Sequence, residues 1–321
     1  ANASAAAAAD AAATAAPGPA TAVAPSIVCP PESIVCVHSN YSRLSSIVQK
    51  HAPGGVDGIL ADLGVSSMQL DDPDRGMTYK RDGPLDMRLD MTNAGLSTAS
   101  ELLDMWSEDT LIKILIRNSD EEFAEGIAAS IKRGIAAAGG RERDGRRGGE
   151  VKKAGKGSGT FGNITTTAEL AAAVKKGVPR GTSEEELKAI NRRVFQALRI
   201  QVNDEFGKLD ALLEAIPFAL KPGGRVAVLT FHSGEDRRVK LAFRDGVRAG
   251  VYSCASDMIR PSWDEQMDNP RAKSAKLRWA MKASDAGEGI VEVEEEEDAD
   301  EKLQEWELGA VAASVRWKND D

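Results

Sequence analysis

The sequence predicts an α/β protein in which a parallel sheet is interrupted by a long helical segment. Short β-branched runs at residues 33–37 and 56–63 flank a helix-like stretch at 44–50, which is the order of a β-α-β unit. A third apolar run, 225–231, follows a Pro-Gly-Gly turn of the kind that ends helices. Between these regions, residues 97–190 carry helical spacing and few strand signals. Apolar strands that follow helices are typical of a parallel sheet covered on both faces.

The first residues are almost all Ala, with Pro, Gly, Ser and Thr, so they offer no large side chains to bury. We expect residues 1–26 to be a disordered tail. Together with the other low-complexity segments, this tail favours a eukaryotic chain from a plastid or mitochondrion. Targeting peptides are usually Arg-rich, however, and the first arginine here is Arg43. A bacterial chain would be expected in the cytoplasm.

Composition disfavours two other classes of protein. No apolar run approaches the roughly 20 residues that cross a bilayer, so no membrane partner is expected. The three cysteines and three histidines are too few and too scattered for a disulfide framework or a structural zinc site. We therefore expect no metal and a reducing compartment.

The predicted helical insertion, residues 97–190, contains two helix-like stretches at 99–116 and 121–135. Within it, Lys132–Lys156 holds nine Lys/Arg against three acidic residues, and it is rich in glycine. Such a composition favours a solvated, flexible chain. Residues 132–160 are therefore predicted to form a mobile basic loop.

A capping box at Ser183–Glu186 predicts a long helix that runs through Arg199. Arg192, Arg193 and Arg199 cluster near its middle. Arginines on an amphipathic helix can simply form a solvated face, or they can neutralise the phosphates of a nucleic acid. The pattern leaves both alternatives open.

Charge is distributed unevenly along the chain. Residues 288–307 hold eleven acidic residues and one lysine, a local charge of −10. Because the whole chain carries −9, the remaining residues together carry about +1. The predicted acidic segment, 284–307, therefore accounts for the acidic balance, and the net charge does not exclude a nucleic-acid partner. Residues 308–321 form a separate C-terminal segment.

Polar residues follow two of the predicted strands. Asp62–Gln69 comes at the end of the second β-branched run, and His232–Arg238 follows the third. In a parallel sheet both loops would converge on one crevice, where ligands of open α/β sheets bind. Both loops also have a structural explanation, since Asp, Gly and Ser are ordinary loop formers. In particular, Ser233 is expected to cap a helix with Asp236 at the third following position, while His232 orders the turn.

Two further stretches, Asp71–Gly76 and Arg81–Asp90, are dense in alternating charges. Clustered aspartates can bind a hard cation, but neither stretch has the spacing of an EF-hand loop. Internal Asp–Arg pairing that orders a loop over the crevice is the favoured interpretation.

Several motifs occur in a fixed order along the chain. They are Asp57–Ser67, Gln69–Asp72, Asp82–Arg88, Phe195–Ile200, Phe231–Ser233 with Glu235–Arg237, and Asn269–Arg278. Together they resemble the MraW/RsmH family of small-subunit ribosomal RNA N4-cytosine methyltransferases. The resemblance covers about residues 34–280. It implies a class I (Rossmann-like) S-adenosyl-L-methionine (SAM) methyltransferase fold with an inserted helical domain, and it assigns residues 27–96 and 191–283 to the α/β core.

The resemblance also implies a chemistry and the residues that perform it. Tyr41 matches a family aromatic that lines the SAM pocket, and Asp62 and Gln69 match other cofactor contacts. Asp62 is also the candidate catalytic group, because the exocyclic amine of cytosine is a poor nucleophile that must be aligned and must lose a proton. The expected partner is small-subunit rRNA or a 30S-type subunit. The basic candidates for contacting RNA are Arg192, Arg193, Arg199, Arg271, Lys273 and Lys276.

The chain departs from the family pattern at its start. In the family, a first strand, a Gly-Gly-His-Ser loop and a second strand ending in an acidic residue precede the segment that here begins near Ile34. None of these is visible in residues 1–33, which predicts an N-terminally truncated fold with exposed neighbouring strands. Gly234 also stands where the family usually has leucine. Two hypotheses follow: an rRNA methyltransferase, and a non-catalytic RNA-binding or ribosome-assembly protein derived from one.

Overall fold

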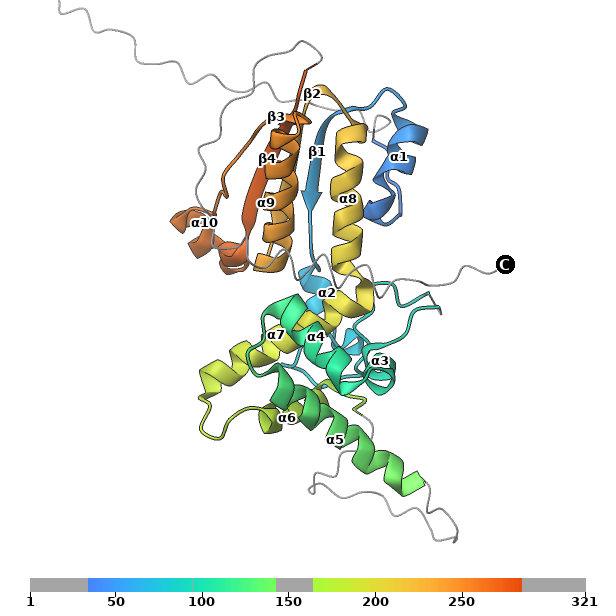
Figure 1. Cartoon of the computed structure of the whole chain (residues 1–321), viewed down its shortest axis with the longest axis vertical. Helices are drawn as coiled ribbons and strands as arrows, with labels where there is room; N and C mark the ends of the chain where they lie inside the picture. The colour runs from blue at the N-terminus through green and yellow to red at the C-terminus, as the bar shows by residue number, and fades with distance from the viewer. Residues whose placement is uncertain (1–33, 94, 143–163, 285–321) are drawn as a thin grey trace, which may run out of the picture. The chain divides into compact units, whose positions relative to one another are not determined.

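The structure, a computed structural model, describes residues 34–93, 95–142 and 164–284 (Figure 1). Backbone contacts divide the chain into two units, residues 1–39 and 40–321. The predicted tail, the acidic segment beyond residue 284 and the C-terminal segment lie outside the described residues.

The first unit differs from the strand predicted at residues 33–37. Its described residues form neither helix nor strand, and Ile34 and Val35 are each 64% exposed. A β-branched run becomes a strand only where a neighbouring strand hydrogen-bonds to it, and no ladder among the described residues includes this run. The prediction is therefore wrong for residues 34–37.

The second unit contains a four-stranded sheet in the order β1-β2-β4-β3 (Figure 1). The strands are β1 (Val56–Asp62), β2 (Leu220–Thr230), β3 (Tyr252–Ala255) and β4 (Lys276–Lys282). The α/β class is confirmed, and β1 and β2 run parallel as predicted. Strand β4, however, is antiparallel to both β2 and β3, so the prediction of a parallel sheet is wrong for this half. The chain between β3 and β4 holds only short helices, and antiparallel neighbours need no long crossover connection.

Helices α8 (Glu205–Ala219) and α9 (Ser233–Arg248) cover one face of the sheet, and α1 (Leu44–His51) packs beside α8 (Figure 1). Helix α1 confirms the helix predicted at residues 44–50. Side chains of a strand alternate between its two faces, and those of β2 that face the helices, such as Val226 and Val228, are fully buried.

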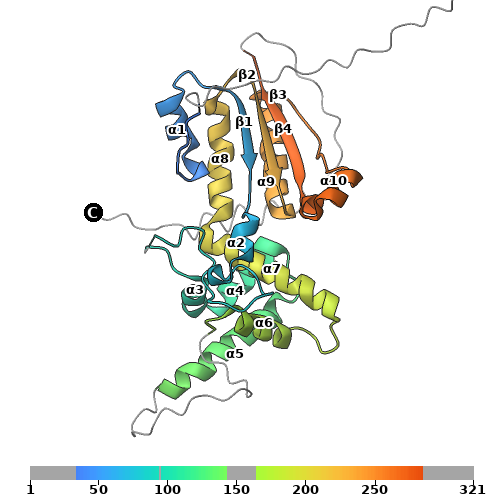
Figure 2. The same cartoon turned by 180° about the vertical axis from the view of Figure 1, so that it is seen from behind.

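The opposite face of the sheet is open in the described part of the chain. Figure 2 shows the strands from this side, with the helices behind them. Leu60 is 76% exposed here, and a shallow apolar hollow of about 470 Å³ lies between Leu60, Ala227 and Trp279. The prediction that helices cover both faces is therefore wrong for the described residues.

A second hydrophobic core lies among the helices below the sheet in Figure 1, where fully buried side chains such as Leu103, Leu115 and Leu198 pack together. The helices that form it are α3 (Ala99–Met105), α4 (Glu108–Ser119), α5 (Ala124–Glu142), α6 (Thr167–Gly177) and α7 (Glu184–Asn203).

Two predictions for these helices need correction. The stretch 99–116 is not one helix, because Trp106 ends α3 and the Ser107 side chain starts α4 by accepting a hydrogen bond from the backbone N–H of Thr110. The prediction of a basic loop is wrong for residues 132–142. These residues continue α5, because the alanines here favour a helix. Its remainder, residues 143–160, lies outside the described residues.

Helix α7 packs in the helical core and leads into α8, which packs in the core under the sheet. It begins as predicted, with the Ser183 hydroxyl accepting from the backbone N–H of Glu186 at 3.2 Å. It then crosses the predicted domain boundary at residue 190, and Val194 beyond this boundary is fully buried in the helical core. Asp204, in the left-handed conformation with φ 49°, separates α7 from α8.

Five short elements complete the described fold. They are η2 (Tyr41–Arg43), α2 (Ser67–Asp71), η3 (Pro73–Arg75), α10 (Trp263–Asp268) and η4 (Pro270–Ser274). Within the described ranges, no helix has the length and apolar character needed to cross a bilayer.

Candidate functional site

The ends of β1 and β2 lie side by side. Asp62 pairs in register with Leu229, and the backbone N–H of Leu63 donates to the Leu229 carbonyl at 3.0 Å. Beyond them, Gly64 adopts φ 93°, and a side chain there would contact the Phe231 ring. The predicted convergence of the two loops at one end of the sheet is confirmed.

A capping box fixes the loop after Asp62. The Ser66 hydroxyl accepts from the backbone N–H of Gln69 at 3.2 Å, and the Gln69 side-chain oxygen accepts from the backbone N–H of Ser66 at 2.9 Å. The amide NH₂ of Gln69 has no partner among the hydrogen bonds of the described residues, so it can donate to a ligand. Asp62 is exposed at the strand end, where its carboxylate can accept.

The loop after β2 is ordered differently from the prediction. The helix-capping residue is His232, not Ser233: the His232 Nδ1 accepts from the backbone N–H of Glu235 at 3.4 Å. The Glu235 carboxylate accepts from the backbone N–H of Phe231 at 3.0 Å. Ser233 is already the first helical residue, so its hydroxyl cannot occupy the capping position.

Glu205, at the start of α8, accepts hydrogen bonds from Arg199 on the adjoining helix α7 and from the distant Tyr41. The Arg199 guanidinium donates to both of its carboxylate oxygens, at 2.8 and 3.0 Å. The Tyr41 hydroxyl donates to its backbone carbonyl at 3.5 Å. Burial raises the pKa of Tyr41 to about 12, and the negative charges of Glu205, Glu235 and Asp204 add to this effect. Tyr41 therefore stays a neutral hydrogen-bond donor.

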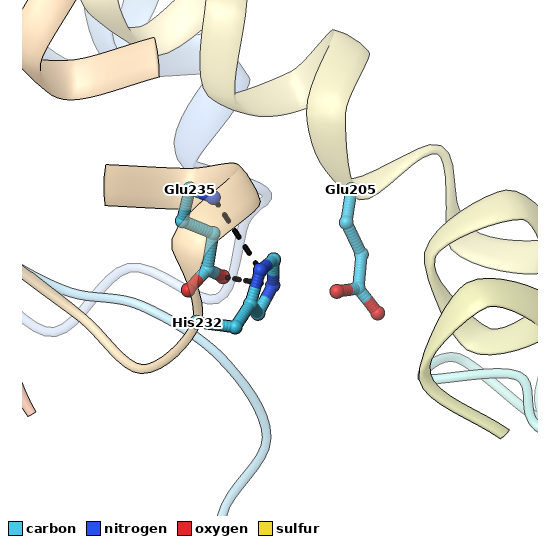
Figure 3. A group of neighbouring side chains, drawn as sticks. All are labelled: Glu205, His232 and Glu235. Atoms are coloured by element: carbon cyan, nitrogen blue, oxygen red, sulfur yellow. Dashed lines mark hydrogen bonds and ion pairs between the residues drawn. The ribbon is translucent and has the colours of Figure 1, made fainter. Parts of the chain in front are cut away.

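Glu205, His232 and Glu235 form a cluster with ligand-type atoms within 4.8 Å of one another (Figure 3). The cluster does not fit a metal ion. Because His232 Nδ1 accepts a hydrogen bond, the proton of the neutral imidazole lies on Nε2, which then has no lone pair for a metal. Both Glu205 oxygens also face Arg199. The arrangement is instead a charge network.

Glu235 is the most buried carboxylate of this network, and its pKa is lowered. Burial by itself raises the pKa, but the neighbouring His232 imidazole, the hydrogen bond from the Phe231 N–H and the charge of Arg199 outweigh burial. The His232 Nε2 lies 3.4 Å from a Glu235 oxygen, close enough for charge interaction but without hydrogen-bond geometry. Glu235 therefore stays ionised and holds the loop after β2.

The predicted Asp–Arg pairing is confirmed in the charged stretches after α2. Arg88 donates to both oxygens of Asp86 at 2.7 Å, and Arg75 lies 3.7 Å from Asp72. Burial raises the pKa of Asp86, but hydrogen bonds and charge from Arg88 outweigh it and lower that pKa. These aspartates serve as partners for arginine.

The predicted RNA contacts separate into two groups. On α7, Arg193 donates to both oxygens of Glu121, whose side chain is fully buried, and Arg199 donates to Glu205. Of the three arginines on this helix, only Arg192 is exposed without an ion pair among the described residues. The others lie at the end of the sheet that carries Asp62. Arg271 bonds Asp71 at 3.0 Å, Lys273 is exposed, and Lys276 starts β4.

Neither Glu205 nor the role of Glu235 is predicted from the sequence. His232 and Glu235 belong to a recognised motif, so their spacing after a strand was a usable signal. Glu205 gave no such signal, because its partners Arg199, His232 and Tyr41 meet it only through the turn at Asp204 and the packing of α8.

Comparison with known proteins matches residues 20–283 to the family described as the MraW methylase family. Ribosomal RNA small subunit methyltransferase H 1 of Lachnoclostridium phytofermentans is 43% identical over 254 residues, which is 79% of this chain and 63% of that protein. The protein of the same name from Agathobacter rectalis is 46% identical over 245 residues, 76% of this chain and 63% of that protein.

Ribosomal RNA small subunit methyltransferase H 2 of Acholeplasma laidlawii is 46% identical over 232 residues, which is 71% of this chain and 60% of that protein. The chain thus spans less than two thirds of the length of these three relatives.

Proposed function

Because the chain belongs to the MraW methylase family, we propose that it transfers the methyl group of SAM to the exocyclic N4 of a cytosine in small-subunit rRNA. The relatives named above carry rRNA small-subunit methyltransferase names, which supports rRNA as substrate. The target cytosine has to be unpaired or flipped out, because N4 takes part in base pairing within a duplex.

One observation carries the proposal: Asp62 presents an exposed carboxylate at the paired ends of the two parallel strands. In this position it accepts a hydrogen bond from the N4 amine and aligns the amine for attack. As the new bond forms, N4 becomes more acidic, and Asp62 is the group that can receive or relay its proton.

Tyr41 and Gln69 offer groups that suit the aromatic and polar parts of SAM. SAM supplies an electrophilic methyl group on a sulfonium sulfur. The Tyr41 ring offers an aromatic wall for the adenine, and the free amide NH₂ of Gln69 offers a donor that its capping bond leaves available. Glu235 and Arg199 act indirectly, by ordering the loop after β2 and the start of α8.

The test is methyl transfer to small-subunit rRNA, followed by mass spectrometry of the released nucleosides. We expect N4-methylcytidine, and Asp62→Asn is expected to lower its rate of formation by about 100-fold. Asp57→Asn is the matched control, since Asp57 lies on the same strand at its other end and pairs with Lys221 in solvent. Methylation of another atom, or full activity of Asp62→Asn, would contradict the proposal.

A second candidate function is RNA binding without catalysis, in a protein derived from the methyltransferase. The position of β1 favours this function. The ligand crevice of a doubly wound sheet lies between the ends of two neighbouring strands, and among the described residues β1 is an edge strand with a neighbour on one side only. Calorimetry with SAM separates the two. RNA binding by a chain that takes up no SAM would support the non-catalytic function.

A further inference from the structure

We propose that the exposed side chains of Trp263, Met267 and Ile259 form a stacking platform for an unpaired RNA segment beside the target cytosine. The inference rests on the proposed function, because it names the surface that receives its substrate. It adds a base-stacking contact to the basic residues already considered.

The platform consists of large apolar side chains that the fold leaves uncovered. Trp263 is 72% exposed, Met267 62% and Ile259 46%. Trp263 and Met267 are four residues apart on α10, so they lie on one side of this helix. The acidic residues of α10 are turned away from Trp263 by about 100° or more around the helix axis. They are Asp264, Glu265 and Asp268.

The register of the sheet brings this segment to the end that carries Asp62. Ile259 forms a two-hydrogen-bond bridge with Leu277, both bonds at 2.9 Å. Leu277 pairs with Leu229 on β2, which in turn pairs with Asp62 on β1. One row of residues therefore runs across the sheet from the Asp62 carboxylate to the platform.

A second contact fixes the same segment from the other side. The Arg271 guanidinium donates to the Asp71 carboxylate at 3.0 Å, which ties η4 to the helix α2 that carries Gln69. Helix α10 packs directly against η4 and shares Asn269 with it. The platform is thus anchored to the loop that follows Asp62.

The chemistry of the surface favours RNA. Basic residues flank the platform in the sequence: Arg260 next to Ile259, and Arg271, Lys273 and Lys276 after α10. Proteins that bind single-stranded RNA stack bases on aromatic rings and neutralise the adjacent phosphates with Lys and Arg. A two-fold contact of this surface with the same surface of a second copy would bring these basic residues against one another, so RNA is the better match.

The experiment measures binding of a fluorescently labelled, unpaired oligoribonucleotide to the 321-residue chain, in the absence of SAM, by anisotropy. Trp263→Ala is expected to weaken binding by about 10-fold, and Trp263→Tyr to retain most of it. Phe218→Ala is the matched control, because Phe218 is an aromatic residue that is 86% exposed on α8. Lys273→Ala is expected to reduce the dependence of RNA affinity on salt concentration by about the amount that corresponds to one phosphate contact.

Equal RNA affinity of the wild type and Trp263→Ala would overturn the inference, as would a wild type that binds no RNA. Dimers that dissociate on Trp263→Ala would assign the surface to a second copy instead, and loss of binding to a ribosomal protein with unchanged RNA affinity would assign it to a protein partner. Because no SAM is present, failure of methyl transfer leaves the result unaffected. If Trp263→Ala binds RNA normally while the wild type methylates rRNA, the stacking platform is overturned and the proposed function stands.

Discussion

At the scale of single residues, neighbouring arginines on α7 have different environments. The Arg193 guanidinium pairs with a Glu121 carboxylate that is 0% exposed, whereas Arg192 is exposed. A buried carboxylate that loses its partner keeps its desolvation cost without the compensating attraction. Position on the helix thus decides whether an arginine stabilises the fold or is available to RNA.

Arg193→Ala is expected to lower the free energy of unfolding by about 3 kcal/mol, because it leaves Glu121 buried and unpaired. Urea unfolding followed by circular dichroism checks this value. Arg192→Ala is the control and should change stability by less than about 0.5 kcal/mol. Equal effects of the two substitutions would contradict the assigned pairing.

Glu235 gives a prediction for pH. Its folded-state pKa lies below the ordinary value of 4.5, so its contribution to stability is present above pH 4.5 and is lost as the pH falls through the folded-state pKa. Glu235→Gln should therefore be less stable than the wild type at pH 7, and the difference should shrink below pH 4.5. Urea unfolding midpoints of both proteins, measured at pH 7 and below pH 4.5, check this prediction. A stability difference that does not depend on pH would contradict the lowered pKa of Glu235.

At the scale of elements, close backbone approach explains where glycine is required. Helices α5 and α6 pack so tightly that a Cβ on Gly177 would lie 2.5 Å from the Ile127 Cα. A Cβ on Gly234 would similarly lie 2.7 Å from the Phe206 ring, so glycine at this position is matched to its neighbour. Packing, not turn geometry, fixes both positions.

Gly177→Ala is expected to destabilise the helical core by about 2 kcal/mol, because backbone atoms of α5 cannot move aside as a flexible side chain would. Gly54→Ala is the control, since nothing lies within 4 Å of a Cβ there. Thermal unfolding compares the two. An unchanged stability of Gly177→Ala would contradict the close approach of α5 and α6.

At the scale of the whole molecule, the sheet has one covered face and one open face. In the described residues, α8 and α9 lie on the same side, and apolar side chains of β1, β2 and β4 line the other. Patches of this kind usually mark a surface that another segment or partner covers.

Because the two faces differ in burial, substitutions of neighbouring residues on β1 are expected to lower the free energy of unfolding by different amounts. Ile59→Ala should cost about 2 kcal/mol, because Ile59 packs against the core under the helices. Leu60→Ala should cost less than about 0.5 kcal/mol, since Leu60 is 76% exposed. Urea unfolding of both variants checks the prediction. A large loss of stability for Leu60→Ala would contradict the open face.

The sequence by itself determined the local features of this protein. Apolar runs placed β1 and the paired part of β2, a Ser hydroxyl marked the start of α7, and the ordered motifs identified the family. These signals are contained in short stretches of chain, because strand periodicity, capping and motif spacing act over a few residues.

The tertiary structure decided what depends on distant partners. The direction of β4, the open face of the sheet and the meeting of Tyr41 and His232 at Glu205 each require segments far apart in sequence to be packed together. The same packing gave Arg193 a buried partner and left Trp263 exposed. Local spacing carries no information on such contacts, since burial and pairing are fixed only when the elements assemble.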